Sequence, residues 1–279
     1  MKVPNRIKPL VEEGLVDAVL RQLMSGKEAE VYVVRCAEEI RCAKVYKEAS
    51  KRSFRQAVQY TEGRKVKNSR RARAMQNGSR YGRDQQEVAW QNAETDTLRR
   101  LAAAGVRVPR PYNFLDGVLL MEMVTDEEGG AAPRLNDLEL TSQQAREYHE
   151  LLIAQIVQML CAGVIHGDLS EYNVLVGSNG PIIIDLPQAV DPAGNSSAEA
   201  LLERDVDNIT RYFGQFAPEL RTTDFGKEIW SIYRSGKLHP GINLTGTFAR
   251  SEKAADVRSV VREINDVAKE EAARHRYQQ

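Results

Sequence analysis

The stretch HGDLSEYNVLVGSNGPIIIDLPQ, residues 166–188, decides the fold of this 279-residue chain. Asp168 and Asn173 stand five residues apart on a polar loop that follows a long predicted helix. Asp185 comes 12 residues after Asn173, where the apolar strand 182–184 ends. The segment between them predicts a hairpin, with VLV and PIII as strands and GSNG as the turn. We therefore expect two carboxylates and an amide to meet beside this hairpin.

This spacing suits phosphoryl transfer. That reaction needs a carboxylate that positions the acceptor hydroxyl and takes its proton, and it needs an amide and a second carboxylate that hold magnesium against the phosphates. Magnesium keeps several waters and takes few protein ligands, all of them oxygen atoms. We predict Asp168 as the catalytic carboxylate, and Asn173 and Asp185 as metal ligands. The alternative is an ordinary polar loop, but the order, the spacing and the apolar strand together favour the site.

Two triplets further along the chain imitate motifs of protein kinases: Asp-Phe-Gly at 224–226 and Ala-Pro-Glu at 217–219. Asp224 lies 56 residues after Asp168, and no predicted strand leads into it. The two triplets also stand in the reverse of the kinase order. Apolar residues at helical spacing follow Asp224, which predicts a helix that this residue caps. We therefore exclude both triplets from the site.

A lysine and a glutamate upstream are candidates for a buried pair. Lys44 lies in the predicted strand CAKVYK, and Glu94 lies on the apolar stripe of a helix, between Trp90 and Leu98. A carboxylate at such a position is costly unless it is paired. We predict that it pairs with Lys44 and directs the ammonium group toward phosphate. Glu87 is the competitor, but the helix dipole already explains an acid in the first turn.

The candidate phosphate loop is MSGKEAEVY, and it has one glycine, with neither a Gly-x-Gly-x-x-Gly nor a Walker A pattern. Backbone N–H groups around Gly26, with the side chains of Ser25 and Lys27, are able to cradle phosphate. An ordinary turn is the alternative.

The fold class expected from the order of elements is α+β in two lobes, 1–123 and 124–279. The first lobe is rich in strands and the second in helices. The expected elements are a helix over 8–22, strands in EVYVV, IRCAKVYK, PRPYNFLD and GVLLMEMV with a turn at Asp116–Gly117, a helix ending at Gly105, a helix with a Thr141–Gln144 capping box running to Gly163, and three helices after Ala198.

Charge is unevenly distributed, although the net charge is zero. Residues 51–83 hold eleven Lys or Arg and one acid, which predicts a mobile, solvated basic insertion over about 51–85. The longest apolar run, LLIAQIVQMLCAGVI, is too short to span a bilayer, so no membrane is expected. The three cysteines have no zinc-binding spacing, and a reducing cytoplasm is the expected location.

Several segments together resemble the RIO family of atypical serine protein kinases. They are SGKEAEVY, CAKVYK, WQNAETDTLRRL, VLLMEMV, HGDLSEYNVLV, IIIDLPQAV and ERDVDNITRYF. The resemblance covers roughly residues 20–213 and favours the founding subfamily, which lacks an N-terminal winged helix. Two features depart from the family: Gly167 stands where most members carry Ala, and Leu186-Pro187 replaces Val-Ser.

This resemblance implies a bilobal kinase-like fold with a reduced helical lobe, and it implies ATP and Mg²⁺ as cofactors. By the resemblance, Asp168 is the catalytic residue, Asn173 and Asp185 hold the metal, and Lys44 with Glu94 serves the phosphates. Nucleotide contacts are then expected from Ser25, Gly26, Lys27, Met121, Glu122 and Met123.

The implied activity is transfer of the γ-phosphoryl group of ATP to serine, in protein substrates and in the chain itself. One alternative is a small-molecule kinase of the aminoglycoside or choline type, which shares HGDL, NVLV and IID. Another is a nucleotide-gated switch for RNA or ribosomal particles, because residues 51–83 carry the charge to engage phosphate backbones. Any such RNA affinity is expected to depend steeply on salt.

Overall fold

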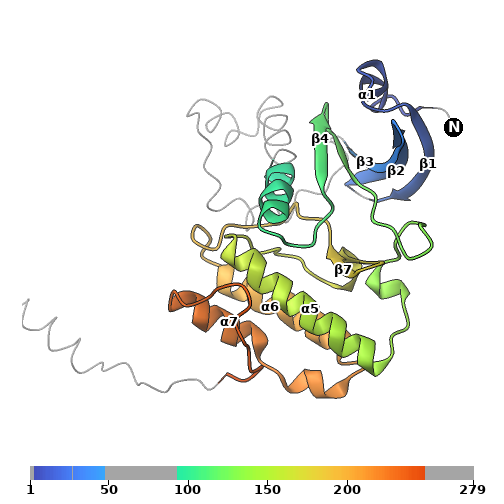
Figure 1. The fold of residues 1–279 in the computed structure, drawn as a ribbon. Helices are drawn as coiled ribbons and strands as arrows, with labels where there is room; N and C mark the ends of the chain where they lie inside the picture. The colour runs from blue at the N-terminus through green and yellow to red at the C-terminus, as the bar shows by residue number, and fades with distance from the viewer. Residues whose placement is uncertain (1–2, 27, 48–92, 249–279) are drawn as a thin grey trace, which may run out of the picture. The chain divides into compact units, whose positions relative to one another are not determined.

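The computed structural model describes residues 3–26, 28–47 and 93–248. Residues 1–247 form one compact unit; the second unit, Phe248–Gln279, is described only at Phe248. Figure 1 shows the strands of a sheet at one end of the first unit and helices α5 to α7 at the other. The α+β class expected from the sequence is confirmed.

The N-terminal sheet has five antiparallel strands in the order β1-β2-β3-β5-β4. Their bounds are β1 (Ala18–Ser25), β2 (Ala29–Cys36), β3 (Glu39–Tyr46), β4 (Pro111–Leu115) and β5 (Val118–Glu122). Asp116 and Gly117 join the last two strands, with φ angles of 48° and 75°. Two consecutive left-handed residues match the twist of a hairpin, so the turn predicted here is confirmed.

The helix predicted over residues 8–22 is wrong in its second half. Helix α1 spans Lys8–Glu12, and the chain then turns through Gly14, whose φ is 70°. Further along, residues 18–25 form β1, which pairs with β2 from Ala18 to Ser25 with register shifts at Leu20 and Leu23. Leu20 and Leu23 are exposed edge-strand residues although they follow a helical spacing. Pairing with a neighbouring strand overrides local periodicity here.

The two faces of this sheet contact different parts of the molecule. One face packs against α1 through a cluster that includes Val34, Ala43 and Leu120. Side chains alternate along a strand, so Lys44 and Tyr46 of β3 lie on the opposite face. Tyr46 belongs to the core cluster that continues into the helices. That face therefore looks toward the site.

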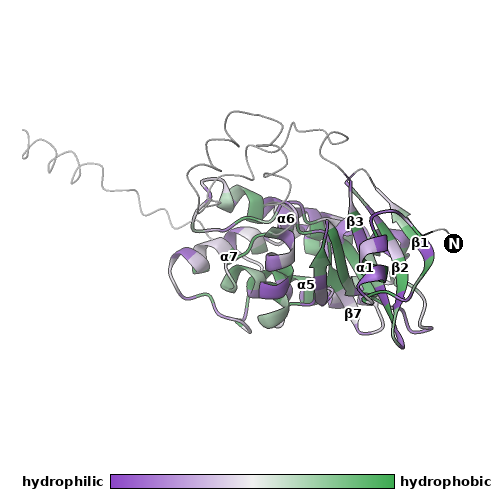
Figure 2. Ribbon diagram, turned by 90° about the horizontal axis from the view of Figure 1, so that it is seen from above, coloured by the Kyte–Doolittle hydropathy of each residue, from purple (hydrophilic) through white to green (hydrophobic). Residues whose placement is uncertain are grey.

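The second half of the unit is built on α5 (Ser142–Cys161), α6 (Ala198–Phe213) and α7 (Phe225–Arg234). The predicted capping box is confirmed: Thr141 Oγ1 accepts from the Gln144 N–H at 3.2 Å, and the Thr141 N–H donates to Gln144 Oε1 at 3.0 Å. Helix α6 contacts both α5 and α7. Figure 2 shows polar and apolar residues on each helix, as expected when one face is buried.

A hairpin and three short 3₁₀ segments complete this half. They are β6 (Val174–Gly177) with β7 (Gly180–Ile183), η3 (Leu135–Asp137), η4 (Glu171–Asn173) and η5 (Pro218–Thr222). The predicted hairpin is confirmed. A further helix spans residues 93–103, and Gly105, with φ of 78°, follows its end as expected. Of the three helices predicted after Ala198, two are α6 and α7, and residues 249–279 lie outside the described part.

A buried histidine makes the stability of this half depend on pH. His149 of α5 is 2% exposed, its Nε2 lies 3.0 Å from Thr210 Oγ1, and its ring contacts the ring of Phe213. Burial lowers the pKa of His149 from its ordinary 6.5 to about 4. Between these values the unfolded chain binds a proton that the folded chain does not. Stability should therefore be lost as pH falls from about 6.5 to 4.

The His149→Phe variant tests this dependence. We expect the difference in free energy of unfolding between parent and variant to shift against the parent by about 3 kcal/mol between pH 7 and pH 4. Urea unfolding at several pH values measures it. A difference that stays constant over this range would show that His149 titrates normally.

Candidate active site

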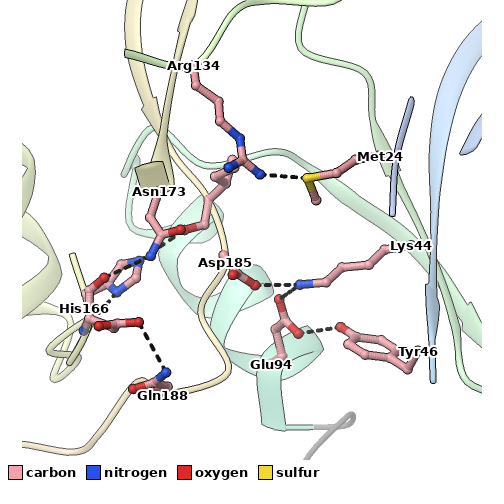
Figure 3. Close-up of polar contacts among 11 residues, drawn as sticks. Met24, Lys44, Tyr46, Glu94, Arg134, His166, Asn173, Asp185 and Gln188 are labelled. Atoms are coloured by element: carbon pink, nitrogen blue, oxygen red, sulfur yellow. Dashed lines mark hydrogen bonds and ion pairs between the residues drawn. The ribbon is translucent and has the colours of Figure 1, made fainter. Parts of the chain in front are cut away.

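The centre of the site is an ion pair between the sheet and the helix at 93–103. Lys44 Nζ lies 2.7 Å from Glu94 Oε1, and the Glu94 side chain is 2% exposed. Tyr46, two residues along the same strand, donates its hydroxyl to Glu94 Oε2. The pair proposed from the sequence is therefore present in the structure (Figure 3), and Tyr46 is a partner that sequence reasoning missed.

Lys44 also contacts a residue in the second half of the unit, Asp185. Its Nζ lies 2.8 Å from Asp185 Oδ1, across 141 positions of the chain. Burial alone would lower the pKa of Lys44, but the charges of Glu94 and Asp185 raise it well above its ordinary value. Burial likewise acts to raise the pKa of Asp185, and Lys44 reverses the sign and lowers it. Both groups are therefore charged at neutral pH.

Asp185 has an unusual backbone, with φ of 65°. It follows β7, and the Ile184 N–H just before it donates to the Asn173 carbonyl at 2.9 Å. This bond ties the strand end to the loop that carries Asn173. The left-handed conformation aims the carboxylate at Lys44, and non-glycine residues rarely adopt it, with Asn and Asp the usual exceptions.

Asp168 and Asn173 lie on the loop between α5 and the hairpin. Asn173 Nδ2 donates to the backbone oxygen of Asp168 at 2.8 Å, which directs the amide oxygen away from that bond. Gln188 Nε2 donates to Asp168 Oδ2 at 3.2 Å. Burial raises the pKa of Asp168, His166 and Arg204 lower it, and Asp185 raises it; the net change is upward. A raised pKa makes this carboxylate a better proton acceptor.

Asp205 of helix α6 accepts two hydrogen bonds from the backbone of this loop. Its Oδ2 accepts from the Gly167 N–H at 2.7 Å, and its Oδ1 accepts from the Leu169 N–H at 3.0 Å. Burial raises the pKa of Asp205 to about 6, although His166 and these two bonds lower it. Glu94 was predicted to be paired because an acid on the apolar face of a helix needs a partner. Asp205, between Leu201 and Ile209 on α6, shows the same pattern in the sequence.

His166 joins the two loops of the site. Its Nε2 lies 3.0 Å from the carbonyl of Ile184, and its Nδ1 accepts from the Asp168 N–H at 3.3 Å. The ring is 2% exposed. These two contacts fix the segment before Asp185 relative to Asp168.

The candidate phosphate loop and hinge lie along the sheet. Ser25 ends β1, and the Gly26 carbonyl accepts from Lys47 Nζ at 2.6 Å; Lys27 lies outside the described residues. Met121 and Glu122 end β5, and Met123 follows. The Glu122 N–H is already engaged with the Arg110 carbonyl at 2.9 Å. The structure thus leaves the nucleotide contacts of these residues as predictions.

Asp224 stands apart from this site, at the N-cap position of α7. Its side chain does not cap the helix, which corrects the sequence expectation. Asp224 Oδ1 lies instead 2.9 Å from Lys227 Nζ, three residues along. Ionic attraction to this lysine competes with the backbone N–H groups for the carboxylate.

The donor set fits one magnesium ion shared with phosphates. Among the described residues, no cluster of three or more His, Cys, Asp or Glu side chains forms a metal cage. Asp185 and Asn173 offer one carboxylate and one amide, and magnesium is usually held by one or two carboxylates together with substrate phosphates.

Every helix within the described ranges is too short or too polar to cross a bilayer.

A two-lobed fold with a Lys–Glu pair and an Asp–Asn–Asp constellation defines a kinase-type phosphotransferase. The family model of the RIO domain matches residues 30–225. A Rio1 serine/threonine-protein kinase of Haloferax volcanii is 32% identical over 211 residues, which cover 74% of this chain and 67% of that protein. A Rio2 kinase of Methanocaldococcus jannaschii is 28% identical, covering 75% and 73%. The chain belongs to the RIO domain family.

A longer relative also matches this chain, and a solved structure shares its fold. The rio1 kinase of Schizosaccharomyces pombe is 30% identical, and the match covers 73% of this chain but 40% of that protein. A crystal structure of a Rio2 kinase–ADP/Mg²⁺–phosphoaspartate complex from Chaetomium thermophilum has a TM-score of 0.54 at 20% identity, covering 84% and 72% of the two chains. That likeness concerns the fold. Since both Rio1 and Rio2 relatives match, the founding subfamily stays a prediction.

Proposed function

We propose that the chain transfers the γ-phosphoryl group of Mg²⁺-ATP to a serine hydroxyl, on protein substrates and on itself. The observation that carries the proposal is Lys44, which contacts Glu94 and Asp185 at 2.7 and 2.8 Å. A lysine held between two carboxylates is already oriented, and this supports a role in contacting the phosphates of a nucleotide.

The proposed roles follow from the contacts. Asp168 orients the acceptor hydroxyl and takes its proton as the oxygen attacks phosphorus. Asn173 and Asp185 would hold magnesium, which when bound neutralises phosphate charge. Glu94 positions Lys44 against the phosphates. Gln188 positions Asp168 by occupying one of its carboxylate oxygens.

The decisive experiment incubates the chain with γ-labelled ATP and magnesium, alone, with a casein-like protein, and with aminoglycosides or amino alcohols. We expect label on the chain and on the added protein, and we expect chelation of magnesium to abolish it. Label that survives hydroxylamine identifies a phosphoester and excludes an acyl phosphate on aspartate. Label on the small molecules alone would replace the proposal with the aminoglycoside or choline alternative.

Removing the Gln188 side chain should affect the chemical step. Because a hydrogen bond to a charged carboxylate contributes about 1.5–3 kcal/mol, we expect Gln188→Ala to lower kcat about ten- to hundredfold and to leave KM for ATP unchanged. Steady-state kinetics at varied ATP measures both constants. Gln143→Ala is the matched control, since Gln143 donates to Glu147 on the surface of α5. A change confined to KM would refute the positioning role.

We also propose a nucleic-acid partner and a cellular location. The basic insertion 51–83 lies outside the described residues, and its eleven Lys or Arg support contact with RNA or a ribosomal particle. Cys36, Cys42 and Cys161 are free thiols, which supports a reducing cytoplasm.

A further inference from the structure

Arg134 is fixed at the base of the site by its backbone. The Pro133 carbonyl accepts from the Val176 N–H at 2.9 Å, and Arg134 forms a bridge with Leu175 of β6. The next residue, Leu135, is fully buried, and its carbonyl accepts from the Tyr212 hydroxyl at 2.7 Å. The side chain of Arg134 therefore starts from a rigid position just behind the Asn173 loop.

From there the side chain crosses toward the N-terminal sheet. Its Nη2 lies 2.6 Å from Met24 Sδ, beside the Ser25–Gly26 end of β1. In the view of Figure 3 the guanidinium of Arg134 points toward Met24, and Asp185 and Lys44 are drawn below it. Its charge is also one of those that lower the pKa of Asp185. Arg134 thus belongs to the same electrostatic environment as the proposed metal ligands.

The Met24 thioether is a weak hydrogen-bond partner for Arg134. A thioether is a weak acceptor, while a guanidinium presents five N–H donors. Within the described residues Arg134 forms no salt bridge, whereas Lys44 contacts two carboxylates. The positive charge of Lys44 is therefore largely balanced before any nucleotide arrives. Arg134 supplies the positive charge that this site has not yet paired.

We propose that Arg134 binds the polyphosphate of the nucleotide from the side opposite Lys44. The guanidinium fork matches phosphate oxygens, and charge-assisted bonds of this type are about twice as strong as neutral ones. On binding, Arg134 exchanges the sulfur of Met24 for phosphate oxygen. This inference rests on the proposed function, because it takes ATP as the ligand.

Calorimetric titration of the full chain with ATP, ADP and adenosine, in magnesium buffer, tests the proposal. In Arg134→Met the chain length is nearly kept and the charge is lost. We expect ATP and ADP to bind about ten- to hundredfold more weakly and adenosine to bind as in the parent. Arg134→Lys, which keeps the charge without the fork, should fall between parent and Arg134→Met. ATP affinity should also fall less steeply with added salt in Arg134→Met.

Arg146→Met is the control, because Arg146 pairs with Glu219 on the surface and should leave every affinity unchanged. Unchanged ATP affinity in both Arg134 variants would overturn the proposal. Equal weakening of adenosine and ATP would also overturn it, since Arg134 would then shape the base pocket. If the parent itself binds no ATP, the proposed function fails instead. Matching thermal unfolding midpoints verify that the variants are folded.

Discussion

Asp185→Asn should lower kcat roughly 10³-fold or more, because a metal held against the phosphates supplies several kcal/mol of transition-state stabilisation. The variant keeps the size of the side chain and removes its charge. It also deprives Lys44 of one of its two carboxylates, at 2.8 Å in the parent. Turnover of ATP at varied magnesium measures the effect, and the magnesium concentration for half-maximal rate should rise.

The chain offers a matched control in Asp224, the aspartate of the misleading Asp-Phe-Gly. Its carboxylate pairs with Lys227 at the surface of α7. Asp224→Asn should therefore leave kcat and the magnesium dependence unchanged. If Asp224→Asn inactivates the enzyme and Asp185→Asn does not, the site has been assigned to the wrong loop.

Glu94→Ala should produce the largest loss of stability, about 3 kcal/mol. Removing one partner of a buried ion pair costs about 3–5 kcal/mol, and the lower end applies because Lys44 keeps Asp185. The substitution also removes the Glu94 carboxylate that accepts from the hydroxyl of Tyr46, a fully buried residue. Urea unfolding at pH 7 gives the free energy, and phosphorylation assays should show activity lost in parallel.

Glu39→Ala provides the comparison for this effect. Glu39 pairs with Arg41 at 2.7 Å, but its side chain is 63% exposed. Exposed pairs contribute about 0–1 kcal/mol, so this variant should unfold almost as the parent does. Similar losses for Glu94→Ala and Glu39→Ala would mean that burial of the Lys44 pair adds no stability.

The sequence predicted those parts of the molecule in which local pattern and tertiary structure agree. The Asp116–Gly117 turn, the Thr141 capping box and the hairpin before Asp185 depend on neighbouring residues, and all three are present. Residues 18–22, the second part of the helix predicted over 8–22, belong instead to β1. Pairing with β2, which lies further along the chain, decides otherwise.

The site follows the same division. The burial argument for Glu94 identified a partner 50 positions away, because a charged residue on an apolar face must be paired. Asp205 on the apolar face of α6 is a second acid of this kind, and it accepts from the backbone N–H groups of Gly167 and Leu169. Gln188 and Arg134 gave no comparable signal, since polar residues in loops are common and only folding brings these two to the site.

The left-handed backbone of Asp185 sets limits on mutational tolerance. An L-residue at φ of 65° costs roughly 1–2 kcal/mol unless it is Gly, Asn or Asp. In a library of every codon at this position, Gly and Asn clones should accumulate as soluble but inactive protein. Valine and isoleucine clones should be depleted from the soluble fraction as well. Selection at this one position therefore has two separable components, one conformational and one chemical.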